Sequence, residues 1–432
     1  MQTVLYWIKK LIPAPVLRVV RPPYHFMWAW VGHLRYGNAS NELTVIGVTG
    51  TKGKSTVTEL IAVILREQGA TVASLSTIQF SYGDTTERNL FKMTQPGHFF
   101  VQRFFRRAVD AGCTHAVVEL TSEGAVQSRH RFIELDALVF TNLTPEHIES
   151  HGSFANYKAA KLEIAKQLTR SKKRPRFIVA NVDDEHGNDF LATKVEHQLP
   201  YSLSDLKLYT LQRDGVSLIF ADGDEERTVR VPLIGKFNVY NALAAITVTR
   251  ALGVPLATAE RALRDLPPVH GRVEPFAADL PDGRHITAVV DYAHTPDSLT
   301  QLYEAFKDYP IIGVLGNTGG GRDTWKRPEM GAIAARYCGE IILTNEDPYD
   351  ENPRKIVEEM LAGIETKDKA EIVMDRRSAI RTALERCPDS GYVLISGKGT
   401  DPYIMGPHNS KEPWSDATVV QEELATLTNA TG

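Results

Sequence analysis

The chain has 432 residues, which is more than one hydrophobic core covers, so two or three domains are expected. Its composition, 43% hydrophobic and 24% charged, is that of a globular protein, and its formal net charge of −4 excludes the basic surface typical of nucleic-acid binding. Its three cysteines lie far apart and match no metal-binding spacing, which favours reduced thiols in a cytoplasmic protein.

Residues 1–42 form a segment unlike the rest of the chain. They combine aromatic side chains with lysines and arginines, and four prolines interrupt them, so we expect irregular structure. No apolar run reaches the roughly 18 residues that a membrane-spanning helix needs, and no signal-peptide cleavage site follows an apolar core. Two interpretations stay open: residues 1–41 lie on a membrane surface, or they pack as a strap on the following domain.

A strand, a phosphate-binding loop and a helix are predicted next. Residues 43–48 are typical of a buried strand, and residues 57–67 place apolar side chains on one helical face. The glycines between them allow backbone N–H groups to face phosphate oxygens at a helix N-terminus. We expect Lys54 to reach the terminal phosphates and the Ser55 hydroxyl to bind Mg²⁺; the alternative is a glycine-rich turn without a ligand. The predicted nucleotide-binding residues are Gly50, Thr51, Lys52, Gly53, Lys54, Ser55 and Thr56.

Beyond this loop, short β-branched runs alternate with helical patterns, as in a doubly wound, mostly parallel α/β sheet. A β-hairpin is predicted around residues 221–224, and a linker at residues 266–271 precedes a second α/β region. The strand candidates are residues 116–120, 137–140, 177–180, 287–290, 311–315, 341–343 and 392–395. We therefore expect an N-terminal segment (1–42), a P-loop-containing central domain (43–268) and a C-terminal Rossmann-like α/β domain (269–432).

Polar side chains follow two of these strands, at the edge where open α/β sheets bind ligands. Glu119 ends one strand and, facing Lys54 and Ser55, is well placed for a metal ion. Residues 141–147, Thr-Asn-Leu-Thr-Pro-Glu-His, follow another strand, and His151 comes shortly after them. Each pattern alone is weak, because a single histidine after a strand is often structural. Their value lies in their combination with the phosphate loop.

Together these motifs resemble the Mur ligase family, the ATP-dependent amide-forming enzymes of peptidoglycan precursor synthesis, and within it the MurE type. The matching motifs run from about residue 44 to residue 416. By this resemblance Glu119 and His147 are Mg²⁺ ligands. Lys161 is a carbamylated lysine that holds a second Mg²⁺, since a carbamate turns the cation into an anion. Without the resemblance, Lys161 is interpreted as a solvated helix lysine.

The resemblance also implies how ATP is held. Asn241 matches the asparagine that contacts adenine, Arg272 matches the linker arginine that reaches the γ-phosphate, and Asp291 matches the ribose-binding aspartate. Because Arg272 and Asp291 lie beyond the linker, we expect ATP to be clamped between two domains that close around it.

The acceptor side of the resemblance rests on residues 119–129. Thr121, Gln127 and Arg129 match positions that hold the D-glutamate of the growing peptide, and an arginine suits a carboxylate. Thr94 is a further candidate for the same pocket. The alternative for Arg129 is an ordinary surface arginine.

The C-terminal region matches glycine-rich MurE segments but departs from the family at one point. Diaminopimelate-adding enzymes read Asp-Asn-Pro-Arg where residues 346–349 read Glu-Asp-Pro-Tyr, so the arginine that grips the second carboxylate of diaminopimelate is missing. With Asp350 and Glu351 adjacent, this pocket suits a cation, so we expect lysine or a similar diamino acid. The candidate residues are Arg322, Glu346, Asp347, Gly397 and Asp401.

The N-terminus is a second departure, because many Mur ligases carry an N-terminal domain that binds the uridine nucleotide, and residues 1–42 are too few to form one. The acceptor is then either a UDP-linked muramoyl peptide that is held less extensively or a lipid-linked one. We predict a monomeric ligase that uses ATP and Mg²⁺. The acceptor carboxylate attacks the γ-phosphate, and the incoming amine then attacks the acyl phosphate.

Two alternatives to this function stay open. A folylpolyglutamate synthase-like ligase also lacks the uridine-binding domain, although the spacing of Gln127 and Arg129 favours the MurE type. A nucleotide-binding scaffold would retain ATP without ligation, and amino-acid-dependent phosphate release would exclude it.

Overall fold

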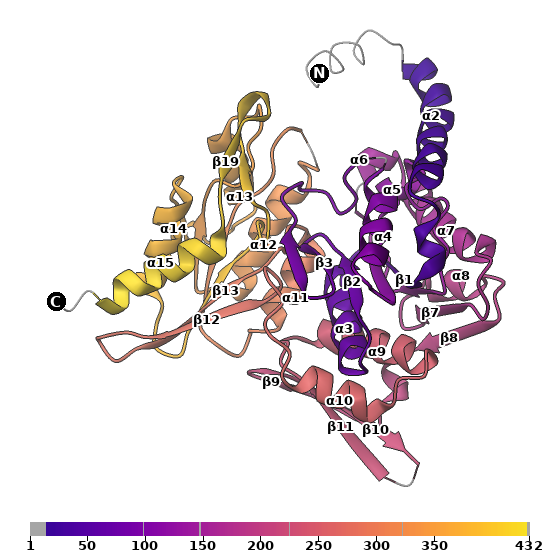
Figure 1. The fold of residues 1–432 in the computed structure, drawn as a ribbon. Helices are drawn as coiled ribbons and strands as arrows, with labels where there is room; N and C mark the ends of the chain where they lie inside the picture. Colours follow the sequence, from indigo (N-terminus) through magenta and orange to yellow (C-terminus); the bar gives the residue numbers. More distant parts are fainter. Residues whose placement is uncertain (1–13, 98, 147, 224, 322, 430–432) are drawn as a thin grey trace. The chain divides into compact units, whose positions relative to one another are not determined.

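The computed structural model describes residues 14–97, 99–146, 148–223, 225–321 and 323–429 (Figure 1). Contacts between residues divide the chain into two compact units. The first comprises the residues up to Leu206 together with Tyr240–Leu263, and the second comprises Lys207–Val239 and Arg264–Gly432. The predicted domain limits at residues 42 and 268 are not tested by this division and stay predictions.

The first unit is built on an eight-stranded sheet of order β4-β3-β2-β5-β1-β6-β7-β8. Strands β2, β5, β1, β6, β7 and β8 pair in parallel, and the β3 and β4 pairings are antiparallel. In this register Val48 lies opposite Glu119, and Thr49 lies opposite Phe140, so the carboxyl ends of β5, β1 and β6 meet at one edge. The strands are β1 Thr44–Thr49, β2 Val72–Leu75, β3 Gln79–Tyr82, β4 Thr85–Arg88, β5 His115–Glu119, β6 Ala137–Phe140, β7 Phe177–Asn181 and β8 His197–Tyr201.

Helices cover this sheet and contribute to one large hydrophobic core with β1, β5 and β6. The predicted helix at residues 57–67 begins earlier, at Lys54. Helix α9 contributes its residues from Tyr240 onward to this unit. The helices are α2 Ala14–Arg35, α3 Lys54–Glu67, α4 Phe100–Asp110, α5 Ser122–Val126, α6 Ile148–His151, α7 Phe154–Arg170, α8 Gly187–Leu191, α9 Lys236–Ala251 and α10 Leu256–Arg264, with 3-10 turns η1 Ala39–Glu42 and η2 Leu203–Asp205.

Helix α2 corrects the expectation that residues 1–42 are irregular; residues 1–13 lie outside the described residues. The helix continues through Pro22 and Pro23, each of which removes a backbone N–H donor. Packing of its C-terminal half offsets this loss, because the Trp28 ring lies edge-to-face with Phe99 at a centroid distance of 5.3 Å, and His33 stacks on Phe132 at 5.0 Å. No helix among the described residues is long and apolar enough to cross a membrane.

The second unit contains a six-stranded sheet of order β12-β13-β17-β14-β15-β16 and an antiparallel sheet of order β11-β10-β9. In the larger sheet only the β12–β13 pairing is antiparallel. The predicted hairpin joins β10 to β11. The strands are β9 Leu208–Gln212, β10 Gly215–Asp222, β11 Glu225–Val231, β12 Glu274–Asp279, β13 His285–Val290, β14 Ile311–Leu315, β15 Glu340–Leu343, β16 Ala370–Ile372, β17 Tyr392–Ile395, β18 Tyr403–Met405 and β19 Lys411–Pro413.

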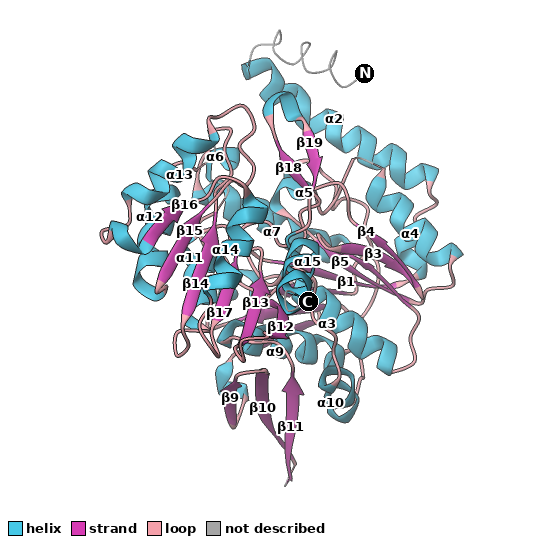
Figure 2. Cartoon of the chain, turned by 90° about the vertical axis from the view of Figure 1, so that its left-hand side faces the viewer, coloured by secondary structure: helices cyan, strands magenta, loops and turns pink. Residues whose placement is uncertain are grey.

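Helices pack on both faces of the six-stranded sheet (Figure 2). Helices α11, α12 and α13 share one hydrophobic cluster with the sheet, and α14 and α15 share the other. The α/β fold class expected from the alternating sequence pattern is therefore confirmed. The helices are α11 Pro296–Glu304, α12 Lys326–Tyr337, α13 Pro353–Ala362, α14 Arg376–Arg386 and α15 Asp416–Asn429, with 3-10 turns η3 Lys367–Lys369 and η4 Pro407–Asn409.

Candidate active site

The loop between β1 and α3 has the backbone that a phosphate-binding loop requires. Gly50 and Gly53 have φ angles of 149° and 79°, values that other residues rarely adopt. A Cβ atom would also collide at both positions, 1.9 Å from Thr141 Oγ1 at Gly50 and 2.3 Å from Asn241 Oδ1 at Gly53. Gly53 is the N-cap of α3 and provides no side-chain cap, which leaves the first N–H groups of the helix to an anion. The loop therefore brings Asn241 beside the predicted phosphate site.

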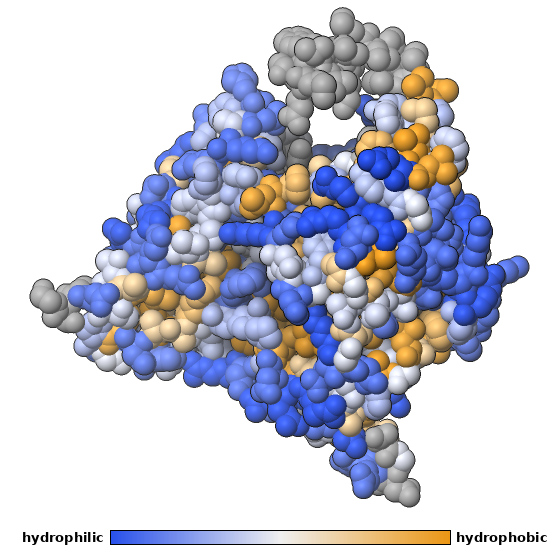
Figure 3. Space-filling model, viewed as in Figure 1, coloured by the Kyte–Doolittle hydropathy of each residue, from blue (hydrophilic) through white to orange (hydrophobic). Residues whose placement is uncertain are grey.

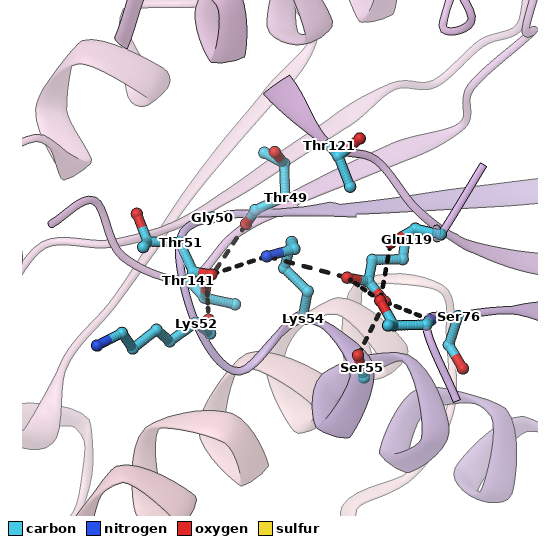
Figure 4. A network of polar contacts seen from close by, with 12 residues as sticks. Thr49, Gly50, Thr51, Lys52, Lys54, Ser55, Ser76, Glu119, Thr121 and Thr141 are labelled. Atoms are coloured by element: carbon cyan, nitrogen blue, oxygen red, sulfur yellow. Dashed lines mark hydrogen bonds and ion pairs between the residues drawn. The ribbon is translucent and has the colours of Figure 1, made fainter. Parts of the chain in front are cut away.

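Lys54, Ser55 and Glu119 meet at the end of β5. The Lys54 Nζ lies 3.9 Å from Glu119 Oε1, and the Ser55 hydroxyl donates to Glu119 Oε2 at 2.9 Å. In Figure 4, dashed lines join the Lys54 and Ser55 side chains to this carboxylate, whereas the Lys52 side chain extends away from it. A hydroxyl and a carboxylate are hard oxygen ligands of the kind that Mg²⁺ prefers, so the donors present fit that ion.

Thr77 is a site residue that the sequence analysis missed. It lies between β2 and β3, and both its backbone N–H and its hydroxyl donate to Glu119 Oε2, at 2.9 and 3.1 Å. The same hydroxyl lies 2.7 Å from that of Thr94, a predicted acceptor residue. Thr77 thus connects the carboxylate of the metal site to the acceptor side. Its only signal in the sequence is a threonine just past a short apolar run.

Lys161, on α7, is buried beside the phosphate loop. The residue is only 1% exposed, and its Nζ donates to the carbonyl of Gly50 at 2.5 Å. Burial, reinforced by the neighbouring charge of Lys54, lowers the pKa of Lys161 well below its ordinary value of 10.5, against the opposing effect of Glu146 and Glu119. The interpretation of Lys161 as a solvated helix lysine is therefore wrong.

The predicted acceptor residues gather around the short helix α5. Thr121 caps this helix by accepting the N–H of Gly124 at 3.1 Å. The Arg129 guanidinium donates to the Gln127 side-chain oxygen at 2.5 Å and to the carbonyl of Gln95. The Nε of Arg129 and both polar side-chain atoms of Gln95 are buried without a hydrogen-bond partner among the described residues. Arg129 is partly buried, and this burial lowers the pKa of its guanidinium group.

Two predicted site residues, His147 and Arg322, lie outside the described residues, and their roles stay predictions. Within the described part of the chain, no group of three or more His, Cys, Asp and Glu side chains is arranged to hold a metal ion. The metal site predicted at Ser55 and Glu119 therefore consists here of one hydroxyl and one carboxylate.

In the second unit, Arg272 and Asp291 lie close together. Asp291 accepts the backbone N–H of Val273, the neighbour of Arg272, at 2.8 Å, and the Arg272 guanidinium lies 4.6 Å from the ring centre of Tyr292. Burial raises the pKa of Asp291, and Arg272 opposes this rise. A Cβ atom on Gly271 would lie 2.6 Å from the backbone of residues 399–400, so the predicted segment 397–401 packs at the same place.

Two carboxylates of the predicted amino-acid pocket form ion pairs with cations of the protein. Lys398 is fully buried and pairs with Asp347 at 2.8 Å and with Asp401 at 3.7 Å. Glu351 accepts two hydrogen bonds from Arg327, at 2.7 and 2.9 Å, and this arginine lowers the pKa of Glu351 to about 2. Lys398 and Arg327 therefore neutralise Asp347 and Glu351. Fewer carboxylates of the expected pocket remain to bind a cation of the substrate.

Glu346 differs from Asp347 and Glu351 in its contacts. The residue is 3% exposed, its Oε1 accepts the hydroxyl of Thr318 at 3.0 Å, and its Oε2 is buried without a hydrogen-bond partner among the described residues. A Cβ atom on Gly397 would lie 2.2 Å from this Oε2. Gly397 therefore leaves the space that the carboxylate occupies.

Comparison with known proteins identifies the family of the chain. Residues 48–249 match the Mur ligase middle domain, and residues 271–399 match the Mur ligase glutamate ligase domain. The chain is 34% identical to the UDP-N-acetylmuramoyl-L-alanyl-D-glutamate–2,6-diaminopimelate ligase of Caldanaerobacter subterraneus subsp. tengcongensis, over 90% of this chain and 80% of that protein. It is also 34% identical to the UDP-N-acetylmuramyl-tripeptide synthetase of Roseiflexus sp., over 96% of this chain and 85% of that protein.

Solved structures with a similar fold include two ligases. A UDP-N-acetylmuramoyl-L-alanyl-D-glutamate–2,6-diaminopimelate ligase superposes with a TM-score of 0.61 at 28% identity and covers 89% of this chain and 78% of that one. Folylpolyglutamate synthase of Mycobacterium tuberculosis, complexed with ADP, shares the fold with a TM-score of 0.69 at 15% identity, over 87% of this chain and 92% of that one. The chain belongs to the Mur ligase family of ATP-dependent, amide-forming ligases.

Proposed function

We propose that this ligase joins an amino acid to the free carboxylate of a muramoyl-peptide acceptor in peptidoglycan precursor synthesis. The observation that carries the proposal is the link from Ser55 through Glu119 and Thr77 to Thr94, because it sets phosphate-binding groups next to predicted acceptor groups. The names of both curated relatives describe enzymes that act on such peptides.

Different residues of the first unit bind different parts of ATP. The backbone of residues 50–56 surrounds the phosphates, Lys54 neutralises the γ-phosphoryl group, and Asn241 contacts adenine. Ser55 and Glu119 hold Mg²⁺, with His147 as a further ligand, and a carbamylated Lys161 holds a second ion. Bound Mg²⁺ supplies positive charge at the phosphate oxygens.

We also propose nucleotide-binding roles for two residues of the second unit. Arg272 reaches the γ-phosphate, and Asp291 accepts hydrogen bonds from the ribose. The packing of Arg272 against Tyr292 and the backbone bonds to Asp291 support these roles, because they fix both side chains in position.

The predicted acceptor residues orient the acceptor carboxylate for its reaction with ATP. Arg129, Gln127, Thr121 and Thr94 hold the acceptor so that its carboxylate attacks the γ-phosphorus, which forms an acyl phosphate and releases ADP. The amine of the incoming amino acid then attacks the acyl carbon and expels phosphate. No protein nucleophile takes part, so the protein contributes orientation and the exclusion of water, which would hydrolyse the acyl phosphate.

The amino acid is lysine or a similar diamino acid. The unpaired Oε2 of Glu346 supports this choice, since a buried carboxylate oxygen is stabilised by an ammonium group of the substrate. The acceptor carrier is either a uridine diphosphate or a lipid diphosphate. We also propose that the enzyme is monomeric and cytoplasmic, with peripheral membrane contact through residues 1–41.

Mass spectrometry of reaction products tests the proposed function. The purified chain is incubated with ATP, Mg²⁺, UDP-linked or lipid-linked muramoyl dipeptide and a pool of amino acids, and phosphate release is followed in parallel. A tripeptide product together with phosphate release that requires both acceptor and amino acid is expected. Phosphate release independent of every amino acid, or glutamate addition to a folate instead, would contradict the proposal.

Replacing Glu346 with glutamine tests the amino-acid pocket. The substitution keeps the size of the side chain but removes its charge, so kcat/KM for lysine is expected to fall about 10- to 100-fold, as for loss of one hydrogen bond to a charged group. The kcat/KM for an uncharged amino acid of similar length is expected to fall less. The matched control is Glu358→Gln, the same change at an exposed glutamate of α13, and this variant is expected to keep the preference of the unaltered enzyme for lysine. Equal losses for charged and uncharged amino acids would contradict the role of Glu346 in recognising an ammonium group.

A further inference from the structure

Helix α2 carries an apolar face that the described residues leave exposed. Positions 20, 24, 27 and 34 fall on one side of a helix with 3.6 residues per turn, opposite the buried Ala29. Figure 3 shows hydrophobic residues gathered over α2, at the upper right of the view. The large apolar residues of α2 that are between 45% and 75% exposed are Val19, Val20, Tyr24, Phe26, Met27, Trp30 and Leu34.

The charge of the N-terminal segment has a single sign. Residues 1–41 contain no Asp or Glu and five Lys or Arg residues, in a chain whose formal net charge is −4. Two of the five, Arg21 and Arg35, are exposed on α2 and lie on the flank of its apolar face. A helix with exposed aromatic rings and exclusively basic charges is complementary to anionic lipid headgroups above an acyl layer.

A second apolar patch lies next to α2, in the loop that leads to the acceptor residue Thr94. Leu90, Phe91 and Met93 are 49%, 52% and 45% exposed. The Phe91 ring lies 5.8 Å from Phe100, and the Trp28 ring of α2 lies 5.3 Å from the preceding residue, Phe99. Both patches therefore adjoin the start of α4.

We propose that α2 and residues 90–93 together form a lipid-docking surface that binds the headgroup region of an anionic membrane. The aromatic and aliphatic side chains enter the interfacial layer while Arg21 and Arg35 contact headgroup phosphates. Because Met93 precedes Thr94, docking places the acceptor pocket at the membrane surface. This surface refines the membrane contact that we proposed for residues 1–41. The placement of the acceptor pocket rests in addition on the proposed ligase activity, whereas the lipid binding does not.

Co-sedimentation of the full chain with vesicles tests this surface. Vesicles of pure phosphatidylcholine are compared with an equimolar mixture of phosphatidylcholine and phosphatidylglycerol, at low and at high salt. We expect binding to the anionic vesicles that weakens with salt, because ions screen the arginine–phosphate attraction. The double variant Met27→Glu/Leu34→Glu is expected to bind these vesicles about tenfold or more weakly, since it places two carboxylates in the apolar face.

The matched control is Leu208→Glu/Leu211→Glu, which makes the same change at two leucines of β9 that are 55% and 54% exposed. This control is expected to bind vesicles like the unaltered chain, and both variants are expected to unfold thermally at an unchanged temperature. Equal vesicle binding by all three proteins would overturn the proposal. A second outcome would also overturn it: the unaltered chain binds no vesicles but forms a dimer, and only the α2 variant dissociates that dimer. A second copy of the chain would then cover α2. The vesicles contain no muramoyl peptide, so a failed ligase assay leaves this readout unaffected.

Discussion

Replacement of Lys54 by methionine is expected to lower kcat/KM for ligation by about 10²- to 10³-fold, the loss typical of removing one charge-stabilising group from a transition state. Methionine keeps the length and apolar stem of lysine but cannot neutralise the γ-phosphoryl group. The Lys54 Nζ lies 3.9 Å from Glu119 and donates to the carbonyl of Thr51 at 2.8 Å, so these contacts hold it beside the phosphate loop. Initial rates of ADP formation measure this loss.

The control for this experiment is Lys166→Met. Lys166 lies on α7, its side chain is 61% exposed, and its partner Glu163 is itself partly exposed, so this pair contributes little to stability. Its replacement is expected to change kcat/KM by less than about twofold. An equal loss in both variants, or a Lys54→Met enzyme that keeps more than a tenth of the wild-type kcat/KM, would contradict the role of Lys54 at the phosphate.

The phosphate loop could be predicted from the sequence because its structure is determined locally. Gly50 and Gly53 occupy backbone angles that glycine favours, and the apolar runs on either side indicate a buried strand and a helix. The position of Glu119 followed equally directly, since parallel strands present their carboxyl ends at one edge. These inferences needed no knowledge of distant contacts.

The remaining features depend on contacts between distant segments, which sequence patterns do not contain. Thr77 meets Glu119 across 42 positions, and Lys398 neutralises Asp347 across 51 positions. The prolines of α2 indicated irregular structure, but the packing of Trp28 and His33 offsets the hydrogen bonds that those prolines remove. In each case tertiary packing outweighs the local signal.

Lys161→Met is expected to abolish ligation while making the protein more stable at neutral pH. Methionine fills a similar volume, so the variant removes a buried ammonium group, whose desolvation costs several kcal/mol, and loses one hydrogen bond to Gly50 worth about 1–3 kcal/mol. The pH dependence has a defined sign, because the folded-state pKa lies below the unfolded value of 10.5. The loss of folding stability caused by the buried ammonium group is complete below the folded-state pKa. It disappears as the pH rises toward 10.5.

The stability advantage of the variant is therefore expected to shrink over that interval when both proteins are unfolded by urea in bicarbonate-free buffer. A residue needed only for packing cannot give this combination, since its loss would lower stability and activity together. Carbon-13-labelled bicarbonate supplies an independent readout, because a carbamate on Lys161 gives a carbonyl resonance that Lys161→Met must lack. A stable, active Lys161→Met enzyme would show that the buried amine is not required. An unchanged carbonyl resonance in that variant would place the carbamate on another lysine.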